Sequence, residues 1–327
     1  MSFIGVSNFS VSGFSRILVT GGAGFIGSHL VEALVRAGFE VNVLDDFSTG
    51  SLENLKGCLE TGKVQIFRGT VEDMHVVEKA AEEVEAIFHL AAITSVPFSI
   101  RHPQVTFAVN VEGTRCLLET CLKADVKRFV YVSSCSVYGE PEYLPIDELH
   151  PLRPISPYAE SKVEAERLCM AYCESHGLKT VMLRLFNVYG PRMRNDQYSG
   201  VVARFIMRLK SGKPPIIYGD GEQTRDFIHV SDVVQALLLA VESRGAYGGT
   251  FNVGSGVPLK INDLAGLLTG IFGLGHVKPI HRRARAGDIR HSYADISRAR
   301  AVLGFKPKIG VREGLASLAP TNRFKFG

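Results

Sequence analysis

The chain has 327 residues, 46% of them hydrophobic and 21% charged, a composition typical of a globular protein with one large domain or two. Its net charge of +4 is too small to indicate a nucleic-acid surface, and no apolar run reaches the ~18 residues of a membrane span. Six cysteines occur without Cys-x-x-Cys or zinc-binding spacing, so we expect reduced thiols in a cytoplasmic protein and no metal site.

The first fifteen residues lack the basic and continuous apolar regions of a signal peptide, so we expect a loose extension before the first strand. From there to about residue 187, short apolar runs alternate with helical patterns. Apolar strands that alternate with helices predict a parallel sheet covered by helices on both faces. The expected strands are 16–20, 40–44, 64–67, 86–90, 128–133 and 180–187. The expected helices are 28–38, 103–124 and 157–177.

After residue 187 the pattern changes, because glycine and proline separate shorter elements. A helix at 230–243 and a strand at 250–254 still have the character of the first part. We therefore expect a smaller C-terminal domain that is interleaved with the larger one. The larger domain is expected to comprise residues 1–187 and 226–256, and the smaller domain residues 188–225 and 257–327.

The first expected strand runs into a glycine-rich turn, in the stretch ILVTGGAGFIGSHL, that opens a helix. Gly21, Gly24 and Gly27 suit a dinucleotide-binding turn, in which glycines permit the turn, the approach of a pyrophosphate and close packing of helix on strand. Asp45 ends the second strand, 21 residues after Gly24, where a carboxylate accepts from ribose hydroxyls and repels a 2′-phosphate. These features predict an α/β fold with a Rossmann-type doubly wound sheet that binds NAD rather than NADP. The alternative is a strand-to-helix turn followed by an unrelated aspartate.

A tyrosine and a lysine share one face of the helix expected at 157–177. Ser156 and Pro157 are typical of a helix start, which places Tyr158 and Lys162 in its first turns. An ammonium group beside a phenol, at the positive end of a helix dipole, favours the phenolate. Ser134, at the end of the fifth strand, can hydrogen-bond the same substrate oxygen. With the lysine and a cationic nicotinamide nearby, the pattern predicts a tyrosine base, and the alternative is an exposed tyrosine beside a solvated lysine.

The chain resembles the extended short-chain dehydrogenases/reductases of the NAD-dependent epimerase/dehydratase family, and most closely the UDP-sugar 4-epimerases such as UDP-glucose 4-epimerase. The matching motifs occur in order over roughly residues 16–310. They are TGGAGFIGSHL, LDDFSTG, HLAA, NVEGT, SSCSVYG, SPYAESK, LRLFNVYGP, GDGEQTRDFIHVSD, FNVGSG and AGDIRHSYAD. The resemblance implies an NAD-binding larger domain and a smaller domain for the nucleotide-sugar.

The resemblance also implies site residues. The catalytic residues are Ser134, Tyr158 and Lys162. The residues around NAD are Gly21, Gly24, Phe25, Ile26, Asp45, Asp46, Ser48, Thr49, Gly50, Thr70, Val71, Leu90, Ala91, Ala92, Asn110, Tyr158, Lys162 and Phe186. The residues around the nucleotide-sugar are Ser134, Ser136, Tyr158, Asn187, Ile216, Tyr218, Arg225, Arg285, Asp288 and Ser292. Thr70 departs from the aspartate that the family often has there, so we expect a looser contact with adenine.

The run Ser134-Cys135-Ser136 bears on the type of reaction. Related 4,6-dehydratases have Thr-Asp-Glu there, and UDP-glucuronate decarboxylases have a glutamate where Ser136 stands. Without those carboxylates the resemblance implies 4-epimerisation through transient oxidation at C4 with bound NAD. The alternatives that stay open are a UDP-glucuronate 4-epimerase, another dehydratase or decarboxylase, and a non-catalytic NAD-binding regulator.

The resemblance carries two finer expectations. Ser292 is small, which leaves space for an N-acetyl group on sugar carbon 2, so UDP-N-acetylhexosamines are expected as substrates besides UDP-glucose and UDP-galactose. The two long helices, 103–124 and 157–176, are expected to pair across a two-fold axis and form a homodimer.

Overall fold

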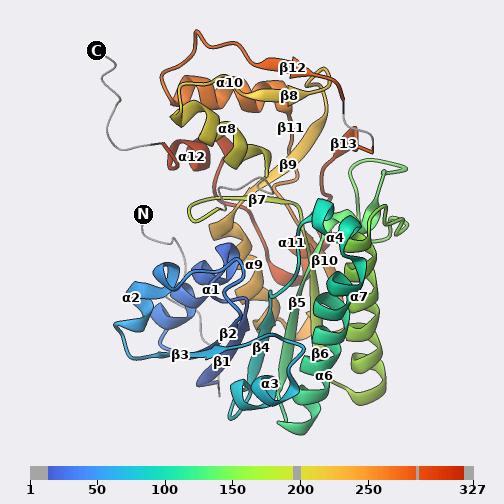
Figure 1. Ribbon diagram of the computed structural model, residues 1–327. Coiled ribbons are helices and arrows are strands. Elements are labelled where there is room, and N and C mark those ends of the chain that lie inside the picture. The colour runs from blue at the N-terminus through green and yellow to red at the C-terminus, as the bar shows by residue number, and fades with distance from the viewer. Residues whose placement is uncertain (1–13, 194–199, 285–286, 320–327) are drawn as a thin grey trace.

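A parallel seven-stranded sheet forms the centre of the computed structural model, which describes residues 14–193, 200–284 and 287–319 (Figure 1). Its order is β10-β6-β5-β4-β1-β2-β3, and every adjacent pair is parallel. The strands are β1 (Arg16–Thr20), β2 (Glu40–Asp45), β3 (Val64–Arg68), β4 (Ala86–His89), β5 (Arg128–Ser134), β6 (Lys179–Leu185) and β10 (Thr250–Val253). The order reverses between β1 and β4, and ligands of such sheets bind beyond the carboxyl ends at that point. The predicted Rossmann-type sheet is confirmed.

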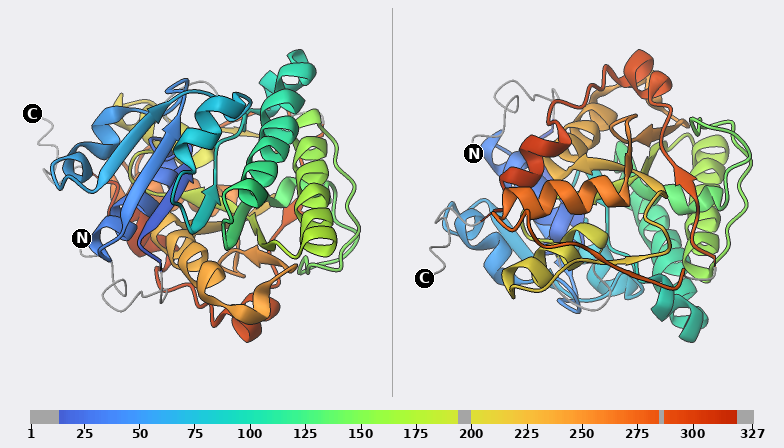
Figure 2. Two further views of the ribbon diagram at one scale, coloured as in Figure 1. Left: turned by 90° about the horizontal axis from the view of Figure 1, so that it is seen from below. Right: turned by 90° about the horizontal axis from the view of Figure 1, so that it is seen from above.

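Helices cover both faces of this sheet. On one face lie α1 (Phe25–Arg36), α9 (Val230–Glu242) and α11 (Ser297–Leu303), and on the other α3 (Met74–Ala80), α6 (Gly113–Lys123) and α7 (Pro157–His176). Alternation along β1 explains the two layers, because Ile17 and Val19 pack on the first face and Leu18 on the second. Figure 2 shows α6 and α7 side by side along one side of the molecule.

The smaller part lies at the top of Figure 1 and has its own core. Its strands are β7 (Asn187–Tyr189), β8 (Ile216–Tyr218), β9 (Thr224–His229), β11 (Pro258–Lys260), β12 (Ile280–Arg282) and β13 (His291–Ser292). Its helices are α8 (Val201–Lys210), α10 (Ile261–Ile271) and α12 (Val311–Ala316). The chain alternates between the two parts, since β9 leads into α9 and β13 is followed by α11, which packs against β10. The exact domain ranges stay a prediction.

Several short helices complete the chain. They are α2 (Lys56–Leu59), α4 (Val96–Arg101), α5 (Pro103–Phe107), the 3-10 helices Leu52–Leu55, Cys135–Tyr138 and Arg244–Ala246, and the π-helical turn Ala108–Glu112. The expected helix 103–124 is therefore not regular, because the π-helical turn separates α5 from α6. The expected strand 180–187 is also divided at Phe186, because β6 pairs with β10 whereas β7 leaves the sheet to pair with β9.

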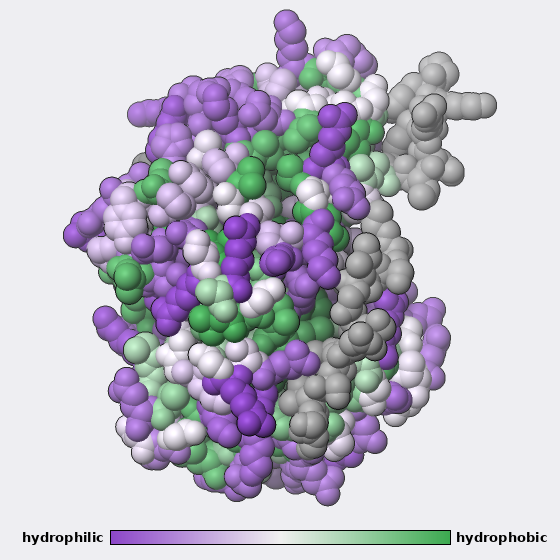
Figure 3. Space-filling view, turned by 180° about the vertical axis from the view of Figure 1, so that it is seen from behind, coloured by the Kyte–Doolittle hydropathy of each residue, from purple (hydrophilic) through white to green (hydrophobic). Residues whose placement is uncertain are grey.

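The surface is mainly hydrophilic on the face seen in Figure 3, and the hydrophobic side chains there gather at mid-height. Within the described ranges, the structure contains no helix that is long and apolar enough to cross a membrane.

Candidate active site

The turn after β1 has the shape of a pyrophosphate cradle. Gly21 has a φ of +67°, and an added Cβ would lie 2.8 Å from the backbone nitrogen of Ala91. An added Cβ at Gly27 would lie 2.1 Å from the Gly21 oxygen, so α1 packs closely on the turn. Gly24, the N-cap of α1, has no side chain that could occupy the N–H groups of the first turn. The chain therefore fits a dinucleotide phosphate, with Phe25 and Ile26 at the helix start.

The end of β2 forms the expected ribose side of this cradle. The Asp45 carboxylate is buried and accepts from the Ala23 nitrogen at 2.9 Å and the Phe47 nitrogen at 2.8 Å. Burial raises the pKa of Asp45, and these two backbone hydrogen bonds oppose the rise. Asp46 accepts from the backbone and the hydroxyl of Ser48, which shapes the loop that continues through Thr49 to Gly50.

The remaining expected cofactor residues lie on three other segments. Thr70 is exposed after β3, whereas Val71 is buried against Gly113 of α6. The segment Leu90 to Ala92 follows β4 and is half-buried beside the glycine turn. Asn110 lies buried in the π-helical turn, and Phe186 is buried between β6 and β7. The expected cofactor residues thus follow the carboxyl ends of β1, β2, β3, β4 and β6, which lie along the same edge of the parallel sheet.

The three expected catalytic residues come from β5 and α7. Ser156 caps α7, because its hydroxyl accepts from the Ala159 nitrogen at 3.2 Å, and this fixes the first turn that contains Tyr158. Tyr158 and Lys162 are buried, and a hydrogen bond connects Tyr158 with the Ser134 side chain. The structure therefore brings a serine and a tyrosine together that are 24 positions apart in the sequence.

The electrostatics differ from the sequence-based expectation. Burial raises the pKa of Tyr158 to about 12, although the hydrogen bond with Ser134 opposes the rise. Lys162 donates to the Val132 carbonyl at 2.9 Å and lies 4.8 Å from the Tyr131 ring. Burial lowers the pKa of Lys162 to about 8. The side chains around Tyr158 do not lower its pKa by themselves, because desolvation of the phenolate outweighs the effects that favour it, whereas the expectation also includes a cationic nicotinamide.

Sequence reasoning missed a buried ion pair behind these residues. Arg184 on β6 contacts Glu166 on α7 at 2.7 Å, and both side chains are at most 6% exposed. The Ser133 hydroxyl donates to the same carboxylate, and Arg184 also donates to the Tyr138 hydroxyl at 3.0 Å. Glu166 lies four residues after Lys162, so its charge opposes the lowering of the lysine pKa. That spacing was the available sequence signal.

The expected nucleotide-sugar residues lie on the smaller part and on its connections. Arg225 on β9 forms an ion pair with Asp288 at 2.6 Å, and Ser292 on β13 is the register partner of Arg225. Asn187 on β7 donates to the Asp226 carbonyl at 3.1 Å. Ile216 and Tyr218 are the end residues of β8, and Arg285 lies outside the described residues.

The segment after Ser134 connects the two groups of expected site residues. Cys135 is close enough to Tyr158 to affect its pKa, and Arg225 in turn affects the pKa of Cys135. The Ser136 hydroxyl is buried, and the described part of the chain offers it no hydrogen-bond partner. A polar ligand between the catalytic residues and β9 would give this hydroxyl a partner.

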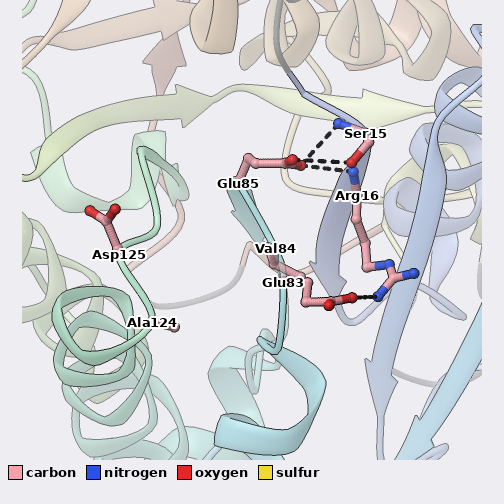
Figure 4. A pocket seen from close by; sticks show the side chains of 7 residues that line it. All are labelled: Ser15, Arg16, Glu83, Val84, Glu85, Ala124 and Asp125. Atoms are coloured by element: carbon pink, nitrogen blue, oxygen red, sulfur yellow. Dashed lines mark hydrogen bonds and ion pairs between the residues drawn. The ribbon is translucent and has the colours of Figure 1, made fainter.

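A pocket at the opposite end of the sheet is a separate feature (Figure 4). It is formed by the amino ends of β1 and β4, where Glu85 accepts from the backbone nitrogens of Ser15 and Arg16 at 3.0 and 2.8 Å. Arg16 also contacts Glu83 at 2.7 Å. These groups bind each other and lie away from the glycine turn, so the pocket does not belong to the candidate active site.

Comparisons with known proteins identify the family of the chain. The model of the NAD dependent epimerase/dehydratase family matches residues 17–254. The UDP-glucose 4-epimerase of Mycolicibacterium smegmatis is 41% identical over 303 residues, which cover 92% of this chain and 96% of that protein. The structure of UDP-glucose 4-epimerase from Thermotoga maritima with UDP-glucose has a TM-score of 0.87 and 39% identity, covering 92% of this chain and 96% of that one. The UDP-N-acetylglucosamine 4-epimerase of Methanobrevibacter ruminantium has a TM-score of 0.88 and 37% identity, with coverages of 93% and 96%.

Proposed function

The chain belongs to the NAD-dependent epimerase/dehydratase family, and we propose that it is a UDP-sugar 4-epimerase that interconverts UDP-glucose and UDP-galactose. The observation that carries this proposal is the group Ser134, Tyr158 and Lys162, with Cys135 and Ser136 beside it instead of a carboxylate pair. A tyrosine–serine site can move a proton at one hydroxyl, but it offers no carboxylate pair for removing water, and Ser136 stands where the decarboxylases have a glutamate. Relatives named as UDP-glucose 4-epimerases support the same reaction.

In this proposal Tyr158 takes the proton from the sugar 4-hydroxyl, and Ser134 hydrogen-bonds the same oxygen. NAD, when bound, accepts a hydride from C4 and returns it. Arg225 and Asn187 hold the nucleotide part while the 4-keto sugar turns its other face. Tyr158 then returns its proton to the carbonyl oxygen, so the reaction has no net oxidation. Asp45 at the end of β2 supports NAD as the cofactor rather than NADP.

We also propose that UDP-N-acetylglucosamine and UDP-N-acetylgalactosamine are accepted. Ser292 lies in register with Arg225, next to the expected anchor of the nucleotide, and it is a small residue. The similarity to a UDP-N-acetylglucosamine 4-epimerase supports this extension.

The test is incubation of the purified protein with a panel of UDP-sugars, without added reductant, followed by identification of the products. The panel contains UDP-glucose, UDP-N-acetylglucosamine, UDP-glucuronate and dTDP-glucose. We expect the 4-epimers of the first two. A 4-keto-6-deoxy product would indicate a dehydratase, and a pentose product would indicate a decarboxylase. If no product forms although the protein binds NAD tightly, the protein is a regulator.

A homodimer and a cytoplasmic location are further parts of the proposal. The faces of α5, α6 and α7 expose large apolar side chains that a second copy could cover, namely Val105, Leu122 and Met170. The six free cysteines suit a reducing compartment. Light scattering at micromolar concentration should give about twice the 35.7 kDa of one chain, and a monomer would contradict the dimer.

A further inference from the structure

A buried histidine lies directly beneath the edge of the sheet that carries the candidate site. His89, the last residue of β4, is 1% exposed. Its Nδ1 lies 2.7 Å from the hydroxyl of Thr20, the last residue of β1, and its Nε2 lies 2.9 Å from the hydroxyl of Thr114 on α6. All three side chains are buried, so each hydrogen bond is formed away from water.

The direction of these hydrogen bonds follows from their neighbours. The Thr114 hydroxyl donates to the backbone carbonyl of Asn110 at 2.6 Å, so it accepts from His89, and Nε2 carries the proton. Nδ1 therefore accepts from the Thr20 hydroxyl. Thr20 in turn accepts from the backbone nitrogens of Leu90 and Ala91, both at 3.2 Å. Burial lowers the pKa of His89 to about 3, so the ring stays neutral and keeps this tautomer near neutral pH.

Both ends of this chain of hydrogen bonds reach residues of the candidate site. At one end it fixes the backbone of Leu90 and Ala91, the segment against which Gly21 packs. At the other end the Asn110 amide donates to the Ser161 hydroxyl at 2.9 Å, and Ser161 donates to the carbonyl of Tyr158 at 2.8 Å. The Asn110 side chain also accepts from the Ile93 nitrogen at 2.8 Å, which closes the chain back onto the segment after β4.

We propose that His89 is a positioning residue that holds the cofactor-side segment after β4 and the catalytic helix α7 in one fixed arrangement. The proposal rests on the proposed function for its catalytic half, whereas its cofactor half concerns NAD binding alone. It also accounts for the irregular helix, because the π-helical turn at 108–112 contains Asn110, the residue that contacts both the segment after β4 and α7. Single π-helical turns are often found at functional sites.

Two variants of His89 separate the two halves of this chain of hydrogen bonds, the Thr20 half and the Thr114 half. In His89→Asn the shorter amide takes the place of Nδ1, so its oxygen can accept from Thr20, but no donor reaches Thr114. In His89→Gln the longer amide reaches the place of Nε2 and can donate to Thr114, but Thr20 loses its acceptor. The loss of one buried hydrogen bond corresponds to a change of about tenfold.

The measurements are the NAD dissociation constant of cofactor-free protein, by calorimetry, and turnover of UDP-galactose at saturating NAD. For His89→Asn we expect an NAD dissociation constant close to that of the wild type and turnover reduced about tenfold. For His89→Gln we expect NAD affinity reduced about tenfold and turnover at saturating NAD reduced less. The same loss of both properties in both variants, or no loss in either, would overturn the proposal.

Threonine-to-valine variants, which are nearly isosteric, test the same two halves of the hydrogen-bond chain if the histidine variants fold poorly. Thr20→Val should weaken NAD binding, and Thr114→Val should reduce turnover. Thr120→Val is the matched control, because Thr120 is buried on the same helix and donates to the Cys116 carbonyl at 2.9 Å, outside the chain of hydrogen bonds. If the control shows the same losses, the effect is general destabilisation and the proposal fails. Without epimerase activity in the wild type the proposed function fails, whereas NAD binding by Thr20→Val still tests the cofactor half.

Discussion

One ion pair of the sheet region and two ion pairs of the smaller region differ in how far they are buried. In the sheet region the Arg184–Glu166 pair is at most 6% exposed and shares its groups with Ser133 and Tyr138. In the smaller region the Arg290–Asp220 pair is about half exposed on both sides, and Arg225–Asp288 is partly exposed. The buried pair suits proton and hydride transfer, which need fixed geometry, because Glu166 lies one helical turn after Lys162.

The variant with the largest expected effect removes the chemistry of the sheet region and keeps its packing. Tyr158→Phe keeps the ring and removes the proposed proton carrier. Turnover of UDP-galactose should fall by about 10²–10⁴-fold, the usual range for a lost acid–base group. Calorimetry should show that the variant still binds NAD. Near-normal turnover in this variant would contradict the role of Tyr158.

The second prediction compares the two kinds of ion pair through one type of substitution. Arg184→Met leaves the Glu166 carboxylate buried without its cation, so the free energy of unfolding should decrease by about 3–5 kcal/mol. Arg290→Met is the matched surface variant, and here the decrease should be about 0–1 kcal/mol. Urea unfolding of both variants measures the difference. Similar values for the two variants would mean that the contrast between the regions has no energetic consequence.

The third prediction concerns acid stability. The pKa of His89 is lowered to about 3 in the folded chain, from the usual 6.5, so below pH 6.5 the unfolded chain binds a proton that the folded chain excludes. Between pH 8 and pH 5 this one residue should therefore lower the free energy of unfolding by about 2 kcal/mol. Urea unfolding at several pH values, compared between the wild type and His89→Asn, isolates its share. The same pH dependence in both proteins would show that His89 binds protons equally in the two states.

The smallest expected effect lies in the smaller region. Ser292→Tyr adds a ring beside Arg225, which should exclude an N-acetyl group but leave space for a hydroxyl. Turnover of UDP-N-acetylglucosamine should fall about tenfold more than turnover of UDP-glucose, in line with the cost of an overfilled pocket. NAD affinity serves as the control for folding. Equal losses for both substrates, or none, would show that Ser292 does not control this selection.

The sequence by itself determined the features that depend on neighbouring residues. The strand that ends at Thr20, the glycine turn with Gly21 and Gly24, and the start of α7 at Pro157 all lie where the pattern predicted them. Periodicity and turn chemistry act over a few residues, so they can be recognised in a single chain. The same holds for the family, because its motifs are short and occur in a fixed order.

Only the tertiary structure decided which of these segments touch and what surrounds them. The link from Thr20 through His89 to Thr114 joins residues up to 94 positions apart, and nothing in the local sequence pairs them. The raised pKa of Tyr158 has the same origin, because desolvation depends on all the elements packed around the ring. Strand pairing likewise divides the run 180–187 at Phe186, since β6 and β7 have partners that lie far away in the sequence.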